Sequence, residues 1–365
     1  MTGLVGLDWG TSSLRAYRFA ADGAMLERRE RALGISAIAD GGFRAAFESV
    51  CADWLGAAPA VAVIACGMIG SRQGWREASY LPTPAGLPEI AGRLLRIDGD
   101  AGRRFAIVPG VRTAHGDGVH DVMRGEETQV FGAHAAGIGA PVEASAGGAG
   151  AAVARFVLPG THSKWVGVRA GRIERFRTYL TGEMFAVLSQ HSILGRLFPV
   201  PDRQSRAADG RVPLRGDHAH DHDHAHAAAA ADADAAADAT ADADATADAD
   251  AVGFELGVRR AAADPGGLAA LLFSVRSEGL LGSLPPDALP AYLSGLLIGA
   301  EIAHALGRES PAAGAPDPIT IIANERLAAR YRRALGLLGA RARTAPGEPA
   351  AQGLVSIARA AGLIG

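Results

Sequence analysis

The chain has 365 residues, of which 48% are hydrophobic, 21% are charged and 5% are aromatic, and its formal net charge is −3. This composition indicates a globular protein of about two domains and excludes collagen-like and wholly disordered chains. Its only two cysteines, Cys51 and Cys66, exclude a disulfide framework. The N-terminus lacks the features of a secretory signal, and no apolar run reaches the ~18 residues of a membrane span. We therefore expect a cytoplasmic protein without a membrane partner.

One low-complexity segment distorts the net charge. Residues 216–251 hold ten Asp and five His but no Lys, Arg or Glu. Alanine is their only apolar residue, so they cannot form a core, and we expect a disordered insertion over 205–251. Subtracting the ten Asp from the 39 acidic residues leaves 29 against 36 basic residues, a formal charge of +7. A basic folded part favours small anionic ligands.

The five alternating histidines of this segment have two interpretations. They offer ligands for a transition metal, or they belong to a repetitive loop insertion that has no function of its own. The histidines are His218, His220, His222, His224 and His226. Because no Arg-rich face with interleaved aromatics appears, no nucleic-acid partner is expected.

The pattern of apolar residues predicts two halves that begin alike. In the first half it predicts strands at 4–9, 14–20, 24–33, 60–66 and 105–108 and helices at 42–55 and 125–137. In the second half it predicts strands at 153–158, 164–169, 172–178 and 319–323 and helices at 181–190, 252–263, 267–274, 286–306, 325–338 and 351–361. Both halves start as strand, Gly-Thr turn, strand, turn, strand, which is a structural repeat of α/β type. The Gly/Ala-rich residues 139–152 read as a linker, so we expect an N-terminal lobe over 1–140 and a C-terminal lobe over 141–365.

The two Gly-Thr turns are the strongest chemical signal. Such turns present backbone N–H groups and hydroxyls to phosphate oxygens, and glycine permits close approach. Asp8 ends the first strand, where a carboxylate can hold Mg²⁺ together with phosphates and water. Two turns that face each other predict a clamp for a polyphosphate. The residues assigned to it are Asp8, Gly10, Thr11, Ser12, Gly160, Thr161, His162, Ser163 and Lys164.

Lys164 has a further argument. It is the only lysine among 36 basic residues, and all the others are arginine. A compact ammonium group is therefore expected to be required here, where the planar fork of arginine would not fit. Contact with a phosphate or with a substrate carboxylate is the functional interpretation.

Longer motifs follow one another along the chain. They are Asp8–Thr11, Cys66–Trp75, Asp121–Gln129, Pro159–Trp165, Thr181–Phe185, Phe273–Arg276, Leu293–Glu301 and Arg330–Tyr331. With these motifs the chain resembles the 2-dehydro-3-deoxygalactonokinase family over nearly its whole length, except 139–152 and 205–251. That family belongs to the superfamily of sugar kinases, hexokinase and actin.

The resemblance implies two ribonuclease-H-like lobes with ATP and Mg²⁺ in the cleft between them. It implies phosphorylation of 2-dehydro-3-deoxy-D-galactonate at O6, with the sugar acid on the N-terminal lobe and the nucleotide on the C-terminal lobe. Gly299 and Asn324 are expected on the nucleotide. One departure is visible, because the strand at 319–322 runs into Ala323 where the superfamily usually has a glycine turn.

Phosphoryl transfer to an alcohol needs a carboxylate base near the hydroxyl. The candidates are Asp121, Glu126 and Glu127, with Asp121 slightly ahead as base or as N-cap of the helix that follows. Glu126 and Glu127 start that helix, where they would also complement its dipole.

The substrate carboxylate needs a cation. Residues 67–75 follow a buried strand, where ligand loops sit in α/β folds. Arg72 is the first candidate for the carboxylate, Gln73 for hydroxyls and Trp75 for a wall along the sugar chain. Arg124 is the alternative cation.

Other functions stay open from sequence alone. One is a kinase for the gluconate-derived epimer, since a single hydroxyl contact separates the two acids. Another is a nucleotide-binding sensor or scaffold without turnover, against which the acidic residues and the basic loop argue. The partners expected are ATP and a small sugar acid, and the expected assembly is a homodimer.

Overall fold

The structure, a computed structural model, describes residues 2–39, 41–57, 61–98, 104–137, 153–199, 244–307 and 318–365. The first half contains β1 (Thr2–Trp9), β2 (Leu14–Ala20), β3 (Met25–Arg31), α1 (Phe43–Ala57), β4 (Ala62–Gly67), β5 (Tyr80–Pro82), β6 (Ala85–Gly86), α2 (Leu87–Gly92), β7 (Leu95–Asp98), β8 (Arg104–Ile107), β9 (Gly110–Ala114), β10 (His120–Met123) and α3 (Glu126–Ala135). The second half contains β11 (Ala154–Leu158), β12 (Ser163–Arg169), β13 (Arg172–Tyr179), α4 (Thr181–His191), α6 (Asp244–Ala263), α7 (Leu268–Leu280), α8 (Leu289–Gly307), β14 (Ile319–Ile321), α9 (Glu325–Leu337), β15 (Ala342–Thr344) and α10 (Pro349–Ala360).

The first sheet places the end of β1 beside the end of β4. Its strand order is β3-β2-β1-β4-β8-β7, with β1 antiparallel to β2 and parallel to β4. Side chains of a strand alternate between the two faces of the sheet. Val5 and Trp9 pack with α1 on the outer face, whereas Leu4 packs toward the interior shared with the second lobe. Asp8 lies on the face of Leu4, directly beside Cys66 of β4.

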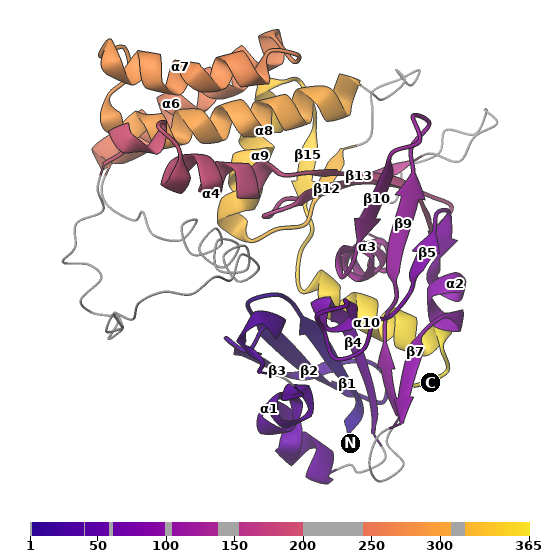
Figure 1. Cartoon of the computed structure of the whole chain (residues 1–365). Coiled ribbons are helices and arrows are strands. Elements are labelled where there is room, and N and C mark those ends of the chain that lie inside the picture. Colours follow the sequence, from indigo (N-terminus) through magenta and orange to yellow (C-terminus); the bar gives the residue numbers. More distant parts are fainter. Residues whose placement is uncertain are drawn as a thin grey trace, which may run out of the picture.

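The second sheet repeats this topology. Its order is β15-β14-β11-β12-β13-β6, with β11, β12 and β13 antiparallel and β11, β14 and β15 parallel. The same pattern relates β1, β2 and β3 and then β1, β4 and β8 in the first sheet. The expected repeat is therefore confirmed, and with it an α/β fold of two similar lobes (Figure 1).

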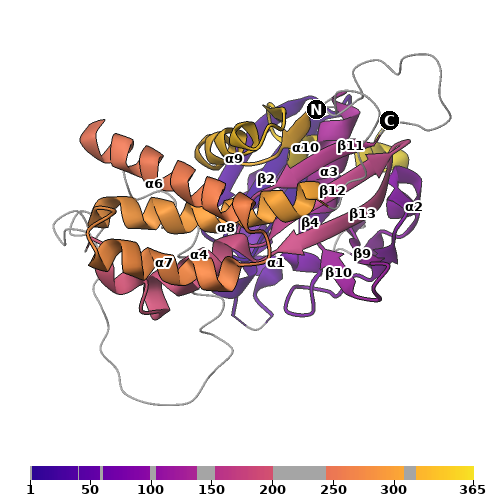
Figure 2. The same ribbon diagram turned by 90° about the horizontal axis from the view of Figure 1, so that it is seen from above.

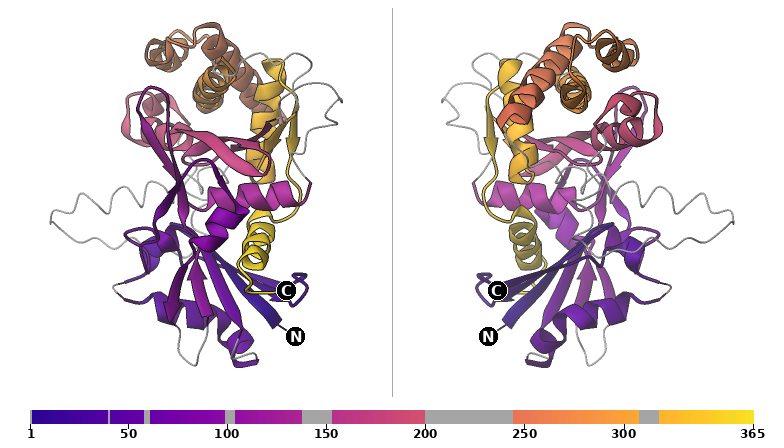
Figure 3. Two further views of the ribbon diagram at one scale, coloured as in Figure 1. Left: turned by 90° about the vertical axis from the view of Figure 1, so that its right-hand side faces the viewer. Right: turned by 90° about the vertical axis from the view of Figure 1, so that its left-hand side faces the viewer.

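Two helices separate the sheets. α3 and α10 lie between the lower and the upper sheet in both side views (Figure 3). One apolar cluster joins Leu4 of the first sheet, Phe131 of α3, Leu354 of α10 and Phe156 of the second sheet. The helices cross closely, because a Cβ on Gly353 would lie 1.9 Å from the Thr128 carbonyl oxygen. The lobe boundary expected between residues 140 and 141 stays a prediction. With that boundary α10 belongs to the C-terminal lobe by sequence, although it packs on the N-terminal sheet.

A helical layer covers the outer face of the second sheet. α6, α7 and α8 lie together there and extend beyond the sheet, as the view from above shows (Figure 2). Residues Pro286–Gly307, which include α8, are long and apolar enough to cross a membrane, contrary to the expectation of no such run, but most of this segment is buried inside the protein. It serves as a core helix between α4, α6 and α7.

The structure also corrects several expected boundaries. Short elements escaped the sequence pattern, namely β5, β6, α2, β7, β9, β10 and β15. The disordered insertion was expected to reach residue 251, but α6 already begins at Asp244. Within this helix Asp250 accepts a hydrogen bond from Arg330 at 2.9 Å. The rest of that insertion, with its five histidines, and the linker 139–152 lie outside the described residues.

Candidate active site

The first Gly-Thr turn is folded against the segment that follows β3. The amide of Gly10 donates to the Ser13 carbonyl at 2.9 Å, which closes the turn. The carbonyls of Gly10, Thr11 and Ser12 accept hydrogen bonds from the amides of Ile35, Ser36 and Gly34, respectively, at 3.0–3.1 Å. A Cβ on Gly34 would lie 2.1 Å from the Thr11 carbonyl oxygen, so this approach requires glycine.

Asp8 is a buried carboxylate at the end of β1, with 9% of the residue exposed. Cys66 Sγ donates to its Oδ1 at 3.8 Å, and Arg15 Nη1 lies 3.5 Å from its Oδ2. Burial raises the pKa of Asp8 above its ordinary value, while Arg15 opposes this rise and the negative charge of Glu126 adds to it. Asp8 and Glu126 therefore act on each other electrostatically.

The start of α3 lies against the end of β4. Gly125 has a φ of +107°, which favours glycine, and its Cβ position would lie 3.1 Å from the Cα of Gly67. Glu126 Oε2 accepts a hydrogen bond from the Arg124 amide at 3.0 Å, and Glu127 Oε2 accepts one from the Gly125 amide at 2.7 Å. The two glutamates thus satisfy amides before the helix.

Lys164 joins the two lobes. Its Nζ lies 3.2 Å from Glu126 Oε1 and donates to the His162 carbonyl at 3.2 Å. Only 5% of its side chain is exposed. The structure therefore places Lys164 of the second lobe beside Glu126 of the first, and the charge of Glu126 acts on Asp8. The clamp formed by two facing turns stays a prediction.

Glu127 is wholly buried, and the pKa of its carboxyl is about 8 because burial, followed by the charge of Glu126, disfavours ionisation. A folded-state pKa above the ordinary 4.5 stabilises the fold at low pH, and this stabilisation is lost as the pH rises through about 8. We expect Glu127→Gln to remove that loss. The free energy of unfolding of the wild type should fall more steeply than that of the variant between about pH 6 and about pH 9. Urea titrations at both pH values measure this, and parallel slopes would contradict it.

The second Gly-Thr turn packs on the start of α4. The Glu183 amide donates to the Thr161 carbonyl at 3.0 Å, and a Cβ on Gly182 would lie 2.5 Å from the Gly160 carbonyl oxygen. His162 Nε2 lies 2.5 Å from Glu183 Oε2. Glu183 therefore sets the orientation of the His162 ring, a partner that sequence reasoning missed.

Ser163 departs from its expected role at the phosphates. It is fully buried, and its hydroxyl donates to Glu301 of α8 at 2.7 Å. Strand alternation explains this, because Ser163 faces α8 whereas its neighbour Lys164 faces the first lobe. Glu301 was not singled out from sequence as a site residue, although a carboxylate within an apolar helix was a visible signal.

Asp121 lies in β10, next to β13 of the second lobe. Its Oδ2 accepts the Thr178 amide and its Oδ1 the Thr178 hydroxyl, both at 2.7 Å. Thr178 is the strand partner of Lys164, so Asp121 lies near the site. The N-cap of α3 is Gly125, not Asp121, which corrects that part of the expectation.

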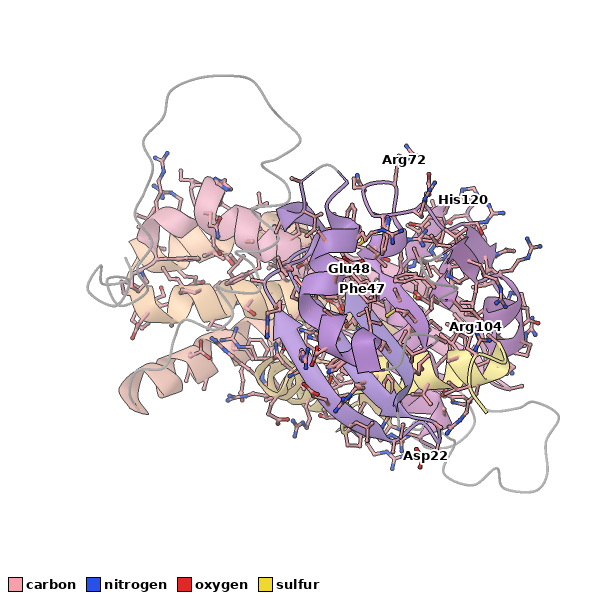
Figure 4. All side chains as sticks on the ribbon, turned by 90° about the horizontal axis from the view of Figure 1, so that it is seen from below. Asp22, Phe47, Glu48, Arg72, Arg104 and His120 are labelled. Atoms are coloured by element: carbon pink, nitrogen blue, oxygen red, sulfur yellow. The ribbon has the colours of Figure 1, made fainter. Side chains whose placement is uncertain are left out.

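Arg72 and Gln73, in the loop after β4, point outward. The side chain of Arg72 is 85% exposed and projects from the edge of the molecule (Figure 4). Its Nε lies 3.8 Å from Glu77 Oε1. Gln73 is exposed as well. Trp75 packs edge-to-face on Phe105 at 5.0 Å, on the outer face of the first sheet, opposite to Asp8. The structure thus brings none of these three to Glu126.

Arg124 is the buried cation of this region, with 8% exposed. Its Nη2 donates to the Ala78 carbonyl at 2.7 Å, and its guanidinium lies over the Tyr80 ring at 4.3 Å. Within the described part of the chain its Nε and Nη1 have no hydrogen-bond partner, and neither has the buried Ser71 hydroxyl. The position that a Cβ of Gly70 would take is 2.9 Å from Nη1. Buried donors of a charged group that lack an acceptor are costly, and these two nitrogens therefore favour a site for an anion.

The two residues expected on the nucleotide have structural partners. Gly299 lies at the crossing of α8 and α6, where a Cβ would be 2.7 Å from Val258 Cα. Asn324 caps α9, its Oδ1 accepting the Leu327 amide at 2.9 Å. Packing against α6 thus requires a glycine at position 299. A contact of Gly299 or of Asn324 with the nucleotide stays a prediction.

The donor set suits Mg²⁺ bound with a nucleotide. Mg²⁺ is commonly held by one or two carboxylates together with substrate phosphates and water. Among the residues that the structure describes, no group of three His, Cys, Asp or Glu could hold a metal by itself. Asp8, which precedes the first Gly-Thr turn, fits a site in which one carboxylate and the phosphates hold the Mg²⁺ together.

Known proteins resemble the chain over its whole length. A model of the 2-keto-3-deoxy-galactonokinase family matches residues 8–240 and 235–357. A protein of Rhizobium meliloti assigned as a 2-dehydro-3-deoxygalactonokinase is 38% identical over 97% of this chain and 96% of its own. The 2-dehydro-3-deoxygalactonokinase of Escherichia coli is 32% identical over 98% of this chain and 97% of its own.

A solved structure from Sinorhizobium meliloti, also assigned as a 2-dehydro-3-deoxygalactonokinase, superimposes with a TM-score of 0.73. It is 34% identical and covers 98% of both chains. The family expected from the motifs is thereby confirmed, together with its fold. The chain belongs to the 2-keto-3-deoxy-galactonokinase family.

Proposed function

We propose that this protein transfers the γ-phosphoryl group of ATP to the O6 hydroxyl of 2-dehydro-3-deoxy-D-galactonate. The observation that carries the proposal is the contact of Lys164, which follows the second Gly-Thr turn, with Glu126 at the start of α3, at 3.2 Å. This pair of one cation and one carboxylate supports transfer of a phosphoryl group to an alcohol, which needs a group of each kind. Family membership and the curated relatives support the same chemistry.

Glu126 is the general base in this proposal. It is partly exposed at 25% of its side chain, so a substrate hydroxyl can reach it. Glu127 is buried beneath it and Asp121 is held by Thr178. The choice among the three carboxylates, which sequence left open with Asp121 ahead, therefore falls on Glu126. The base accepts the proton of the hydroxyl as the oxygen attacks phosphorus.

The two turns bind the phosphates. In this proposal the backbone amides at 11–12 and 160–162 and the Lys164 ammonium bind the negative oxygens of the nucleotide, while the Gly10 amide closes the first turn. Asp8 would hold the Mg²⁺, which neutralises charge on the β- and γ-phosphates when bound. His162, oriented by Glu183, adds a further donor at the second turn.

Arg124 binds the carboxylate of the sugar acid in this proposal. It is adjacent in sequence to the Glu126 region, buried, and has two unpartnered guanidinium nitrogens within the described structure. Arg72 points into solvent instead. Entry of the carboxylate requires the loop at 71–79 to move away from the guanidinium, because these nitrogens are shielded from solvent.

We expect Arg124→Lys to raise KM for the sugar acid by about tenfold to a hundredfold, because a charge-assisted paired contact is lost. KM for ATP should stay unchanged. Arg72→Lys is the matched control and should leave both constants as they are. Steady-state kinetics with each substrate varied in turn measure this. A raised KM for the sugar acid in the Arg72 variant alone would assign the carboxylate to Arg72.

We propose a cytoplasmic homodimer whose partners are ATP, Mg²⁺ and the sugar acid, with no nucleic acid and no membrane. The basic balance of the chain outside 216–251 supports small anionic ligands.

An ADP-release assay tests the proposed function. The acceptors are 2-dehydro-3-deoxygalactonate, its gluconate-derived epimer, galactonate and glucose, each with ATP and Mg²⁺. A strong preference for the first acid supports the proposal. Equal use of the two epimers would support the kinase reaction but contradict the assignment of 2-dehydro-3-deoxygalactonate as the specific substrate. ATP binding without ADP release on any acceptor would favour the sensor or scaffold.

A further inference from the structure

Glu301 is a buried carboxylate of α8 with 3% of the residue exposed. Its Oε1 accepts hydrogen bonds from Ser163 Oγ and Trp165 Nε1, both at 2.7 Å. Its Oε2 accepts from the Tyr331 hydroxyl at 2.7 Å and from the Thr181 hydroxyl. Four side chains from β12, α4 and α9 thus fill the acceptor capacity of one carboxylate.

Two of these donors flank the lysine of the site. Ser163 and Trp165 lie on either side of Lys164 in β12, and neighbouring side chains of a strand point to opposite faces. Ser163 and Trp165 therefore hold Glu301 on one face, while Lys164 reaches Glu126 on the other. The bonds from Ser163 and Trp165 to Glu301 therefore fix the position of β12, and with it the position of the Lys164 ammonium on the other face.

A third donor holds the second Gly-Thr turn. Thr181 begins α4, and in the same turn of that helix the Glu183 amide donates to the Thr161 carbonyl at 3.0 Å. Gly182 is packed against Gly160 so closely that a Cβ would lie 2.5 Å from its carbonyl oxygen. One carboxylate therefore holds both the exit of the turn, at Ser163, and the helix on which the turn rests.

We propose that Glu301 is a positioning residue for nucleotide binding, which holds the second Gly-Thr turn and Lys164 in place from the far face of β12. The inference rests on the proposed function for the identity of the ligand as ATP. Glu301 does not touch the reactants, and it acts through Ser163 and Thr181. Water cannot replace it, because the site is buried and each donor would otherwise lose its partner.

The test compares Glu301→Gln with Tyr331→Phe. Glutamine keeps the size and can still accept from Ser163 and Trp165, but its amide nitrogen cannot accept the hydrogen bonds that Thr181 and Tyr331 donate to Oε2. The helix on which the second Gly-Thr turn rests therefore loses its bond to α8. We expect Kd for ATP and Mg²⁺, measured by calorimetry without sugar acid, to rise about tenfold. KM for the sugar acid should not change.

Tyr331→Phe is the matched control, because it removes a donor from α9 that does not belong to the turn. It should lower Tm to a similar extent and leave Kd for ATP unchanged. Equal losses of Tm with an unchanged Kd in both variants would overturn the proposal and leave Glu301 a purely structural residue.

Ser163→Ala covers the case in which Glu301→Gln does not fold, since it leaves Glu301 three donors. We expect it to raise Kd for ATP several-fold, and an unchanged Kd would overturn the proposal. The binding assay separates this inference from the proposed function. A wild type that binds ATP but phosphorylates no sugar acid would overturn only the proposed function, whereas one without affinity for ATP would overturn both.

Discussion

Replacing Glu126 by glutamine is expected to lower kcat by about 10³-fold, within the range that general bases contribute. Glutamine keeps the size of the side chain and one carbonyl for the Arg124 amide, but it cannot take the proton of the O6 hydroxyl. The variant should fold normally and bind ATP, because Glu126 is partly exposed and its loss leaves no cavity. Single-turnover kinetics with saturating substrates measure the chemical step directly.

Asp121→Asn is the control for this prediction. An amide at Asp121 can no longer accept from both the amide and the hydroxyl of Thr178, so we expect a lower Tm. The loss of kcat should be much smaller than in Glu126→Gln. The reverse order, with Asp121→Asn inactive and Glu126→Gln active, would make Asp121 the base.

Lys164→Met is expected to lower kcat/KM for ATP by about 10²–10³-fold, the range for loss of one group that stabilises developing charge. Methionine preserves the apolar stem, so the effect reports the ammonium group. Lys164→Arg should not restore activity, because the side chain is 5% exposed and lies between Glu126 and the His162 carbonyl. A guanidinium fork has different geometry from a point charge.

The double variant Glu126→Gln with Lys164→Met adds a coupling test. Two groups that act in one step give losses that are not additive. We expect the double variant to be little worse than the poorer single variant. Wild-type kinetics in Lys164→Arg, or fully additive losses, would contradict a joint role at the reacting phosphoryl group.

The repeated lobes could be predicted because their signals are local. Strands of five to eight residues around Asp8 and Lys164 form short apolar runs, and the Gly-Thr turns bound them. The three-stranded sheet escaped prediction because β5, β9 and β10 have three to five residues and too little periodicity. The packing of α10 on the first lobe was not predicted either, because a chain that returns from one lobe to the other leaves no local pattern in the sequence.

Contacts between distant residues decide the site, and these the sequence could not supply. Thr178 lies 57 residues from the Asp121 carboxylate that it holds, and Ser163 lies 138 residues from Glu301. Arg72 and Arg124 are equivalent as cations in the sequence, and only burial distinguishes them. The residue types were thus predictable, whereas their division between chemistry, binding and support depends on tertiary packing.

The most direct test of the central claim is the identity of the product. The purified enzyme is incubated with ATP, Mg²⁺ and 2-dehydro-3-deoxy-D-galactonate labelled with carbon-13, and the product is examined by phosphorus and carbon NMR. We expect one phosphate ester, coupled to C6, formed in equal amount to ADP. A phosphate on another oxygen, or ADP formed without any phosphorylated sugar acid, would contradict the account.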